Sequence, residues 1–97
     1  MALFDDIKTV LRISSSTLAF DNEINDLIKA AKADMILIGI LPEKVNDETD
    51  PLIKRAISIY CKANFGWNNP DSDKYQKSYS LLRTHLSLSA EYTEAVI

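Results

Sequence analysis

Residues 50–67, DPLIKRAISIYCKANFGW, carry the start signal, the periodicity and the stop signal of one helix. Asp50 is a favoured N-cap residue, and Pro51 suits the first helical position because no hydrogen bond there needs its missing N–H. Gly66 can adopt the left-handed conformation that ends a helix. Apolar residues between these ends cover most of the circumference, which predicts a helix at the centre of a packed bundle.

A narrow polar stripe interrupts the apolar surface of this helix, and it consists of Lys54, Arg55, Ser58 and Lys62. A basic stripe can follow the phosphates of a nucleic acid. It can also face acidic loops of the same subunit or of a neighbouring one, and the acidity of the whole chain favours this second use. Trp67, just past the helix, either folds back over the core or anchors an interface, where tryptophan is enriched.

Three further helices are predicted around this central one. Apolar residues recur at helical spacing in each of them, and polar residues lie between. The predicted ranges are residues 3–13, a helix from residue 21 or 22 to residue 38 with Asp21 as N-cap, and a last helix that is capped by Ser72 or Asp73 and ends at residues 86–88.

The remaining segments lack a helical period. Residues 43–50 are acidic and aperiodic, so we expect a loop there. Residues 88–97 have neither a period nor a cap, and we expect an extended tail. Its apolar side chains, Tyr92, Val96 and Ile97, have no reason to be exposed on an isolated tail, which predicts that they dock on another surface.

Length and composition favour one small helical domain. Two glycines and three prolines in 97 residues favour a few long helices over many short strands. We therefore predict an all-α fold over residues 1–97, a small bundle of about four helices with an extended C-terminal tail. No signal peptide and no bilayer-length apolar stretch are visible, so we expect no membrane partner.

The two halves of the chain differ in charge. Residues 1–50 carry ten acidic and five basic residues, a net charge of −5, whereas residues 51–97 carry four acidic and six basic residues, a net charge of +2. Such asymmetry suits head-to-tail association of identical subunits. The alternative is that the charges mix once the chain folds and only keep it in solution.

The residue inventory offers no constellation for catalysis or metal binding. His85 is the only histidine and Cys61 the only cysteine, so this chain cannot assemble a zinc site or an internal disulfide. Two isolated glycines exclude a glycine-rich phosphate loop. The adjacent acids at residues 5–6 and 47–48 lie at a helix start or in a loop, where solvated carboxylates are usual. We therefore predict a protein that is not an enzyme and needs no cofactor.

Several segments, taken in order, resemble the small phage head–tail connector proteins, which are often labelled DNA-packaging proteins in prophages. The family pattern is a short helix ending in Leu-Arg-Ile, an acidic gap, and a helix of the type Ile-x-x-Leu-Ile-x-Ala-Ala-Lys. The resemblance covers about residues 5–92. The matching segments are DDIKTVLRI at 5–13, INDLIKAAK at 24–32, IKRAI at 53–57, KANFGWNNPD at 62–71, YQKSY at 75–79 and THLSLS at 84–89.

The resemblance implies a virion protein that assembles as a ring of identical subunits beneath the portal, commonly twelvefold in the particle. Such a ring extends the DNA channel, through which packaged DNA passes without sequence-specific binding. It also offers a docking surface to a downstream stopper or tail-completion protein. We therefore expect the chain at the head–tail interface of the virion, and in the host cytoplasm during assembly. The alternative is a small helical regulatory or DNA-binding protein of a prophage.

The family offers no short binding motif to transfer, so the interface candidates come from residue types alone. Basic, aromatic, acidic and apolar side chains in three regions are predicted to contact a neighbouring subunit or the portal. They are Lys54, Arg55, Ser58, Lys62, Trp67, Glu43, Asp47, Glu48, Tyr92, Val96 and Ile97.

Overall fold

The computed structural model describes residues 3–66 and 69–94. Within these residues the chain forms six helices and no strand. The helices are α1 (Leu3–Val10), α2 (Asp21–Leu37), α3 (Pro42–Val45), α4 (Pro51–Asn64), α5 (Ser72–Ser87) and α6 (Ala90–Thr93). The all-α prediction is confirmed, but two of the six helices, α3 and α6, are short additions that the sequence did not predict.

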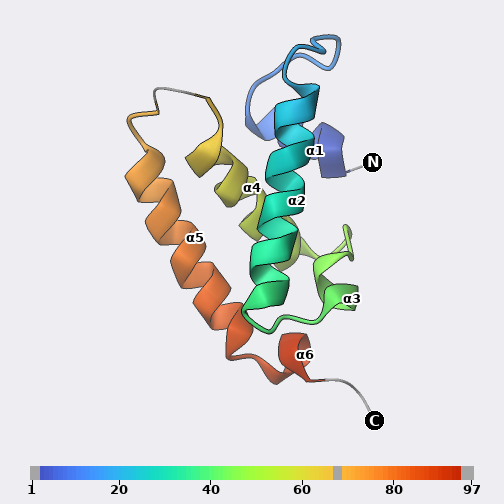
Figure 1. Cartoon of the computed structure of the whole chain (residues 1–97), viewed down its shortest axis with the longest axis vertical. Coiled ribbons are helices and arrows are strands. Elements are labelled where there is room, and N and C mark those ends of the chain that lie inside the picture. The colour runs from blue at the N-terminus through green and yellow to red at the C-terminus, as the bar shows by residue number, and fades with distance from the viewer. Residues whose placement is uncertain (1–2, 67–68, 95–97) are drawn as a thin grey trace.

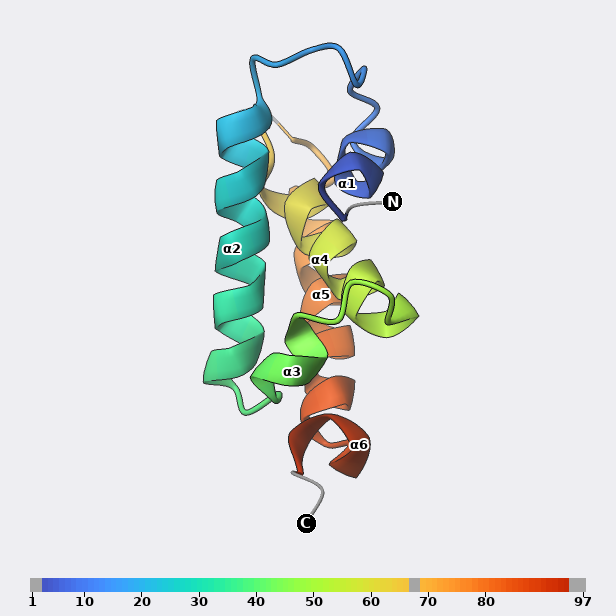
Figure 2. The ribbon, with the colours of Figure 1, turned by 90° about the vertical axis from the view of Figure 1, so that its right-hand side faces the viewer.

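The helix predicted to be central, α4, lies in the middle of the fold (Figures 1 and 2). It contacts α1, α2 and α5, and α2 and α5 are the longest helices. α3 and α6 lie near the end where α2 and α5 finish (Figure 1). The molecule is elongated, with extents of 44 × 28 × 18 Å.

The inner face of α4 forms the middle of the hydrophobic core. Ile53, Ala56, Ile57 and Cys61 are each no more than 1% exposed. Buried residues from the five other helices surround them, among them Ile7, Ile24, Met35, Val45, Tyr79, Leu86 and Tyr92. Full burial of a large aliphatic side chain contributes about 1.5–3 kcal/mol, so this face supplies much of the stability of so small a domain.

Both ends of α4 form as predicted. The Asp50 carboxylate accepts hydrogen bonds from the backbone N–H groups of Leu52 and Ile53, at 2.9 and 3.3 Å. Pro51 is the first helical residue. Gly66 follows the helix with φ of 81°, in the left-handed region that favours glycine. Local start and stop signals therefore place this helix correctly.

The start of α2 differs from the prediction, because Asp21 does not cap it. Phe20 occupies the cap position, and no side chain bonds to the helix start. The Asp21 carboxylate instead accepts a hydrogen bond of 2.9 Å from Lys8 Nζ, which also donates to the backbone carbonyl of Thr17 at 2.6 Å. Lys8 is only 3% exposed. A buried ammonium group without a carboxylate partner costs more free energy than a helix start without a side-chain cap.

Two other helix ends also differ from the prediction. α1 ends at Val10 instead of residue 13, because Arg12 has φ of 61° and so turns the chain out of the helix. Neither predicted cap starts α5, since Asp71 occupies that position. The Ser72 hydroxyl donates instead to the backbone carbonyl of Ala63, at 2.8 Å, and joins the start of α5 to the end of α4.

The segment predicted as an acidic loop, residues 43–50, begins with a helical turn. Pro42 starts α3, and Val45 at its end is fully buried. After this turn, the Asp47 carboxylate accepts hydrogen bonds from the backbone N–H and the hydroxyl of Thr49, at 3.0 and 2.6 Å. A single buried apolar side chain among acidic neighbours does not produce a helical period in the sequence. The prediction of a loop was wrong at α3 for this reason.

The prediction of an extended tail from residue 88 is wrong for the part that the structure describes. α6 forms there, and Tyr92 is only 6% exposed. Its hydroxyl donates a hydrogen bond of 2.9 Å to the Asp50 carboxylate, and its carbonyl accepts one of 2.8 Å from the backbone N–H of Leu41. Tyr92 thus docks on its own chain. Val96 and Ile97 lie outside the described residues.

Candidate functional site

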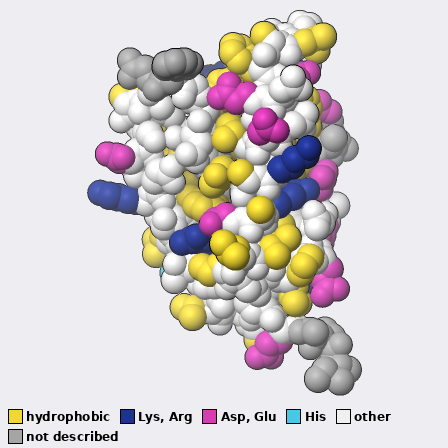
Figure 3. All heavy atoms as spheres, viewed as in Figure 1, with side chains coloured by type: hydrophobic (Ala, Val, Ile, Leu, Met, Phe, Trp, Pro, Cys, Tyr) yellow, Lys and Arg dark blue, Asp and Glu magenta, His cyan; other side chains and the backbone are white. Residues whose placement is uncertain are grey.

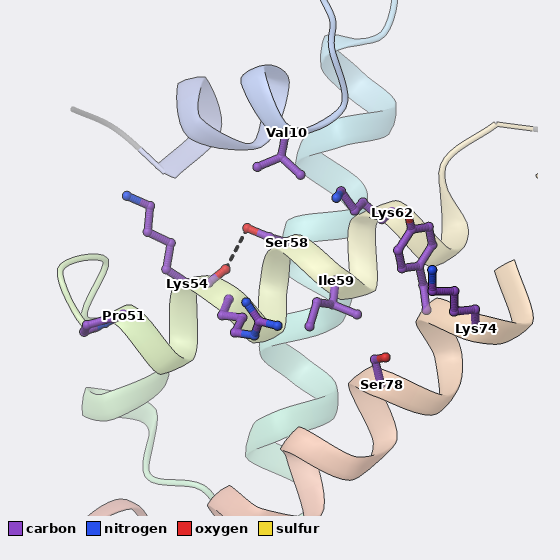
Figure 4. A pocket seen from close by; sticks show the side chains of 10 residues that line it. Val10, Pro51, Lys54, Ser58, Ile59, Lys62, Lys74 and Ser78 are labelled. Atoms are coloured by element: carbon purple, nitrogen blue, oxygen red, sulfur yellow. Dashed lines mark hydrogen bonds between the residues drawn. The ribbon is translucent and has the colours of Figure 1, made fainter. Parts of the chain in front are cut away.

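A basic groove lies between α1, α4 and α5 (Figure 4). Its volume is about 550 Å³. Its basic residues are Lys54, Arg55 and Lys62 from α4 and Lys74 from α5. Ser58 also lines it, so the whole polar stripe predicted from the sequence lies in one concave surface.

The floor of the groove is partly apolar. Val10 points from α1 toward α4, and Ser78 of α5 lies on the other side of Ile59 (Figure 4). Tyr75 adds an aromatic ring to the lining. The Ser58 hydroxyl donates to the backbone carbonyl of Lys54 at 2.8 Å, so its proton is already used within α4. The lining of the groove therefore combines basic side chains with apolar ones.

The basic side chains of the groove differ in their partners. Lys54 Nζ lies 2.7 Å from a carboxylate oxygen of Asp6 in α1. The Lys62 ammonium lies 5.3 Å from the centre of the Tyr75 ring, within the range of a cation–π interaction. Arg55, Lys62 and Lys74 form no salt bridge among residues 3–66 and 69–94. Three cations thus lack a carboxylate partner in the part of the chain described.

An acidic surface lies outside the groove, where α3 and α6 meet. It consists of Glu43, Asp47, Glu91 and Glu94, which line a second hollow of about 550 Å³. Hydrogen bonds from Thr49 lower the pKa of Asp47, so this carboxylate is charged at neutral pH. Glu43 and Asp47, two of the predicted acidic candidates, therefore lie here with Glu91 of α6 and with Glu94, which follows α6. The sequence analysis did not select these two glutamates.

The third acidic candidate, Glu48, lies apart from this surface. Its carboxylate accepts a hydrogen bond of 3.2 Å from the backbone N–H of Leu3 and lies 3.6 Å from Lys32 Nζ. It therefore joins α1, α2 and the segment before α4 within one chain. Trp67 lies outside the described residues, and Tyr92 is buried, as described above.

A polar cluster joins α2 and α5, and the sequence analysis missed it. The Tyr79 hydroxyl donates to the Asp34 carboxylate at 2.6 Å, and Arg83 Nη1 donates to both of its oxygens at 3.0 and 3.1 Å. Burial and the neighbouring Asp34 carboxylate raise the pKa of Tyr79. Asp34 lies 45 residues before Tyr79 in the sequence, so no local pattern could indicate that the two side chains meet.

Charges of the two halves meet within the folded chain. Lys54 pairs with Asp6, and Arg83 pairs with Asp34 at 3.0 Å. Figure 3 shows acidic and basic side chains interspersed with hydrophobic ones on one face of the molecule. Folding therefore brings some opposite charges of the two halves together. The groove and the acidic surface nevertheless each retain a strong local excess of one sign.

Possible metal ligands and a free thiol are present among the described residues. Among them, no three His, Cys, Asp or Glu side chains are grouped so as to hold a metal ion. Burial raises the pKa of the Cys61 thiol to about 12, so it stays protonated and unreactive at neutral pH. No helix in the described part of the chain is long and apolar enough to cross a bilayer.

The fold and the two hollows define a small all-α protein that carries a basic groove and a separate acidic surface. A sequence model of the phage connector proteins matches residues 3–93, so the chain belongs to the phage connector protein family. Phage connector proteins are structural proteins, and membership of this family implies that the chain is a virion component. Searches of curated proteins and of solved structures found no match to the chain.

Proposed function

We propose that the chain joins the portal vertex of a tailed-phage or prophage head to the tail, as a ring of identical subunits that extends the DNA channel. The observation that carries this proposal is the family match over residues 3–93. The portal lies on one side of the ring, and a downstream stopper or tail-completion protein docks on the other. Assembly takes place in the host cytoplasm.

Charge supports this role. The chain has a formal net charge of −3, and like charge keeps packaged DNA from adhering to the channel as it passes. A ring needs two different surfaces on each subunit, because each copy contacts one neighbour on either side. The basic groove and the acidic surface are two such surfaces of opposite sign.

Deleting the gene in a phage that encodes the chain tests the proposal. We expect DNA-filled heads and free tails to accumulate without joining, visible by negative-stain electron microscopy. Supplying the wild-type chain from a plasmid restores joined particles. Normal particles in the deletion strain would refute a connecting role.

A second candidate function, binding of duplex DNA by a small regulatory protein, is favoured only by the basic groove. Three of its cations have no carboxylate partner in the described chain and are available to phosphates. A gel-shift experiment with non-specific duplex at low salt separates the two functions. DNA binding predicts retention that decreases steeply with salt, whereas the connecting role predicts free DNA throughout.

A further inference from the structure

We propose that the basic groove receives the acidic surface of a second copy of this chain. This inference rests on the proposed function, because it names the contact between neighbouring subunits of the ring. The contact is heterologous: α1, α4 and α5 of one copy face α3 and α6 of the next.

Charge complementarity is the first argument. Four basic residues line the groove, and three of them, all except the Asp6-paired Lys54, have no carboxylate partner among the described residues. No acidic residue in the described part of the chain lines the groove. Four carboxylates and a single lysine, Lys44, line the acidic hollow. The Lys44 ammonium lies 5.8 Å from the centre of the Tyr92 ring, so it is directed at its own chain. Opposite potentials of this kind favour one docking orientation and speed the encounter.

The apolar parts of both surfaces are the second argument. Val10 and Ile59 form an incompletely covered floor in the groove, and both are only partly buried. Leu41 and Ala90 lie among the carboxylates of the acidic hollow. Docking of one surface on the other therefore brings apolar groups together while opposite charges pair around them, as at protein–protein interfaces in general.

Hydrogen bonds hold the acidic surface in place outside the groove of its own chain. Tyr92 holds α6 to the start of α4 through the Asp50 carboxylate, and the Leu41 N–H holds the α6 backbone to the segment before α3. Glu91 and Glu94 are exposed on this restrained turn. α6 lies at one end of the elongated molecule (Figures 1 and 2). The contact must therefore form between copies, and repeated heterologous contacts close a ring when the rotation permits.

Paired charge reversals test this contact. The groove variant carries Arg55→Glu and Lys74→Glu, and the acidic-surface variant carries Glu91→Lys and Glu94→Lys. Wild-type chain should self-associate at low ionic strength, and each variant alone should associate at least tenfold more weakly, as measured by sedimentation velocity. An equimolar mixture of the two variants should recover association, because each supplies the surface complementary to the other.

Two control variants each reverse a single charge, one basic and one acidic, outside the two surfaces. Lys77→Glu lies on α5 outside the groove, and Asp26→Lys lies on the exposed side of α2. Both should self-associate like the wild type. Far-UV circular dichroism of every variant confirms that the helices remain, so a loss of association cannot be attributed to unfolding.

The outcomes separate this inference from the proposed function. Wild-type association that both variants retain overturns the inference and leaves the connecting role intact. Loss in the groove variant without recovery in the mixture assigns the groove to a different partner and also overturns it. Duplex DNA retained by the wild type but not by the groove variant assigns the groove to nucleic acid. If the wild-type chain stays monomeric even with portal present, and the deletion strain still joins heads to tails, both proposals fail.

Discussion

Side chains on the two faces of α4 differ in their burial and in their partners. On the inner face, Ile53 and Ile57 are buried among apolar residues of other helices. On the outer face, Arg55 and Lys62 lie beside the partly apolar floor of the groove and form no salt bridge among the described residues. Both faces belong to one helix, so helical propensity cannot explain why one is buried and the other is not. The difference in burial comes from the helices that pack against α4. The inner face stabilises the fold, and the outer face belongs to the groove that we propose as a contact surface.

The same contrast divides α5. Tyr79 and Arg83 face α2 and share the Asp34 carboxylate. Lys74 and Ser78 face the groove, where the structure shows no hydrogen bond from either side chain to another described residue. Polar groups of α5 on the side toward α2 therefore hold these two helices together. The Lys74 and Ser78 side chains on the groove side form no such link between helices.

The largest expected effect contrasts Ile57 with Arg55 on the two faces of α4. Ile57→Ala leaves a cavity in the core and should lower the free energy of unfolding by about 2–5 kcal/mol. Arg55→Ala removes an exposed side chain and should change it by no more than about 0.5 kcal/mol. Urea denaturation followed by far-UV circular dichroism measures both. Equal losses would show that the outer face is as important for stability as the inner one.

The next effect concerns the Asp34 cluster on α2 and α5. Asp34→Ala removes the acceptor of the Tyr79 hydroxyl and of the Arg83 guanidinium, and partly buried donors without acceptors are costly. We expect a loss of about 2 kcal/mol in urea denaturation. Asp26→Ala, on the exposed side of the same helix, is the matched control and should have little effect. A loss of the same size in both variants would mean that the cluster does not hold α5 against α2.

The ranges of the long helices in the sequence followed from local signals, but the way in which distant segments pack on one another did not. Asp50 and Gly66 mark the two ends of α4 in the sequence itself. Lys74 joins the α4 stripe in the groove only because of how α5 packs on α4, which no spacing within either helix encodes. Tyr92 is buried because it meets Asp50, 42 residues away in the sequence. Lys8 likewise finds its carboxylate across a loop.

A smaller effect concerns Tyr92, which holds α6 to the start of α4. Burial and the Asp50 carboxylate raise the pKa of Tyr92 to about 12, from an ordinary value of 10.0. Because the folded state binds the proton more tightly, this stabilisation is complete below pH 10 and is lost as pH rises through 12. Tyr92→Phe should cost about 1 kcal/mol at neutral pH and progressively less above pH 10.

Urea midpoints of the wild type and of Tyr92→Phe at pH 8 and pH 11.5 measure this change. Cys61 and Tyr79 also have raised pKa values, but they titrate in both proteins, so the difference between the two isolates Tyr92. A difference that stays constant with pH would show that the hydroxyl is not bonded to Asp50 in solution.

The smallest expected effect comes from removing a hydroxyl group on the outer face of α4, and it is compared with adding one on the inner face. Ser58→Ala removes a hydroxyl that only bonds to the Lys54 carbonyl of its own helix, and alanine is the better helix former. We expect a gain of about 0.3 kcal/mol. Ala56→Ser adds the same hydroxyl to a fully buried position and should cost about 1 kcal/mol. Opposite signs in urea denaturation would confirm that the two faces differ, whereas a destabilised Ser58→Ala would mean that this hydroxyl takes part in packing within the chain.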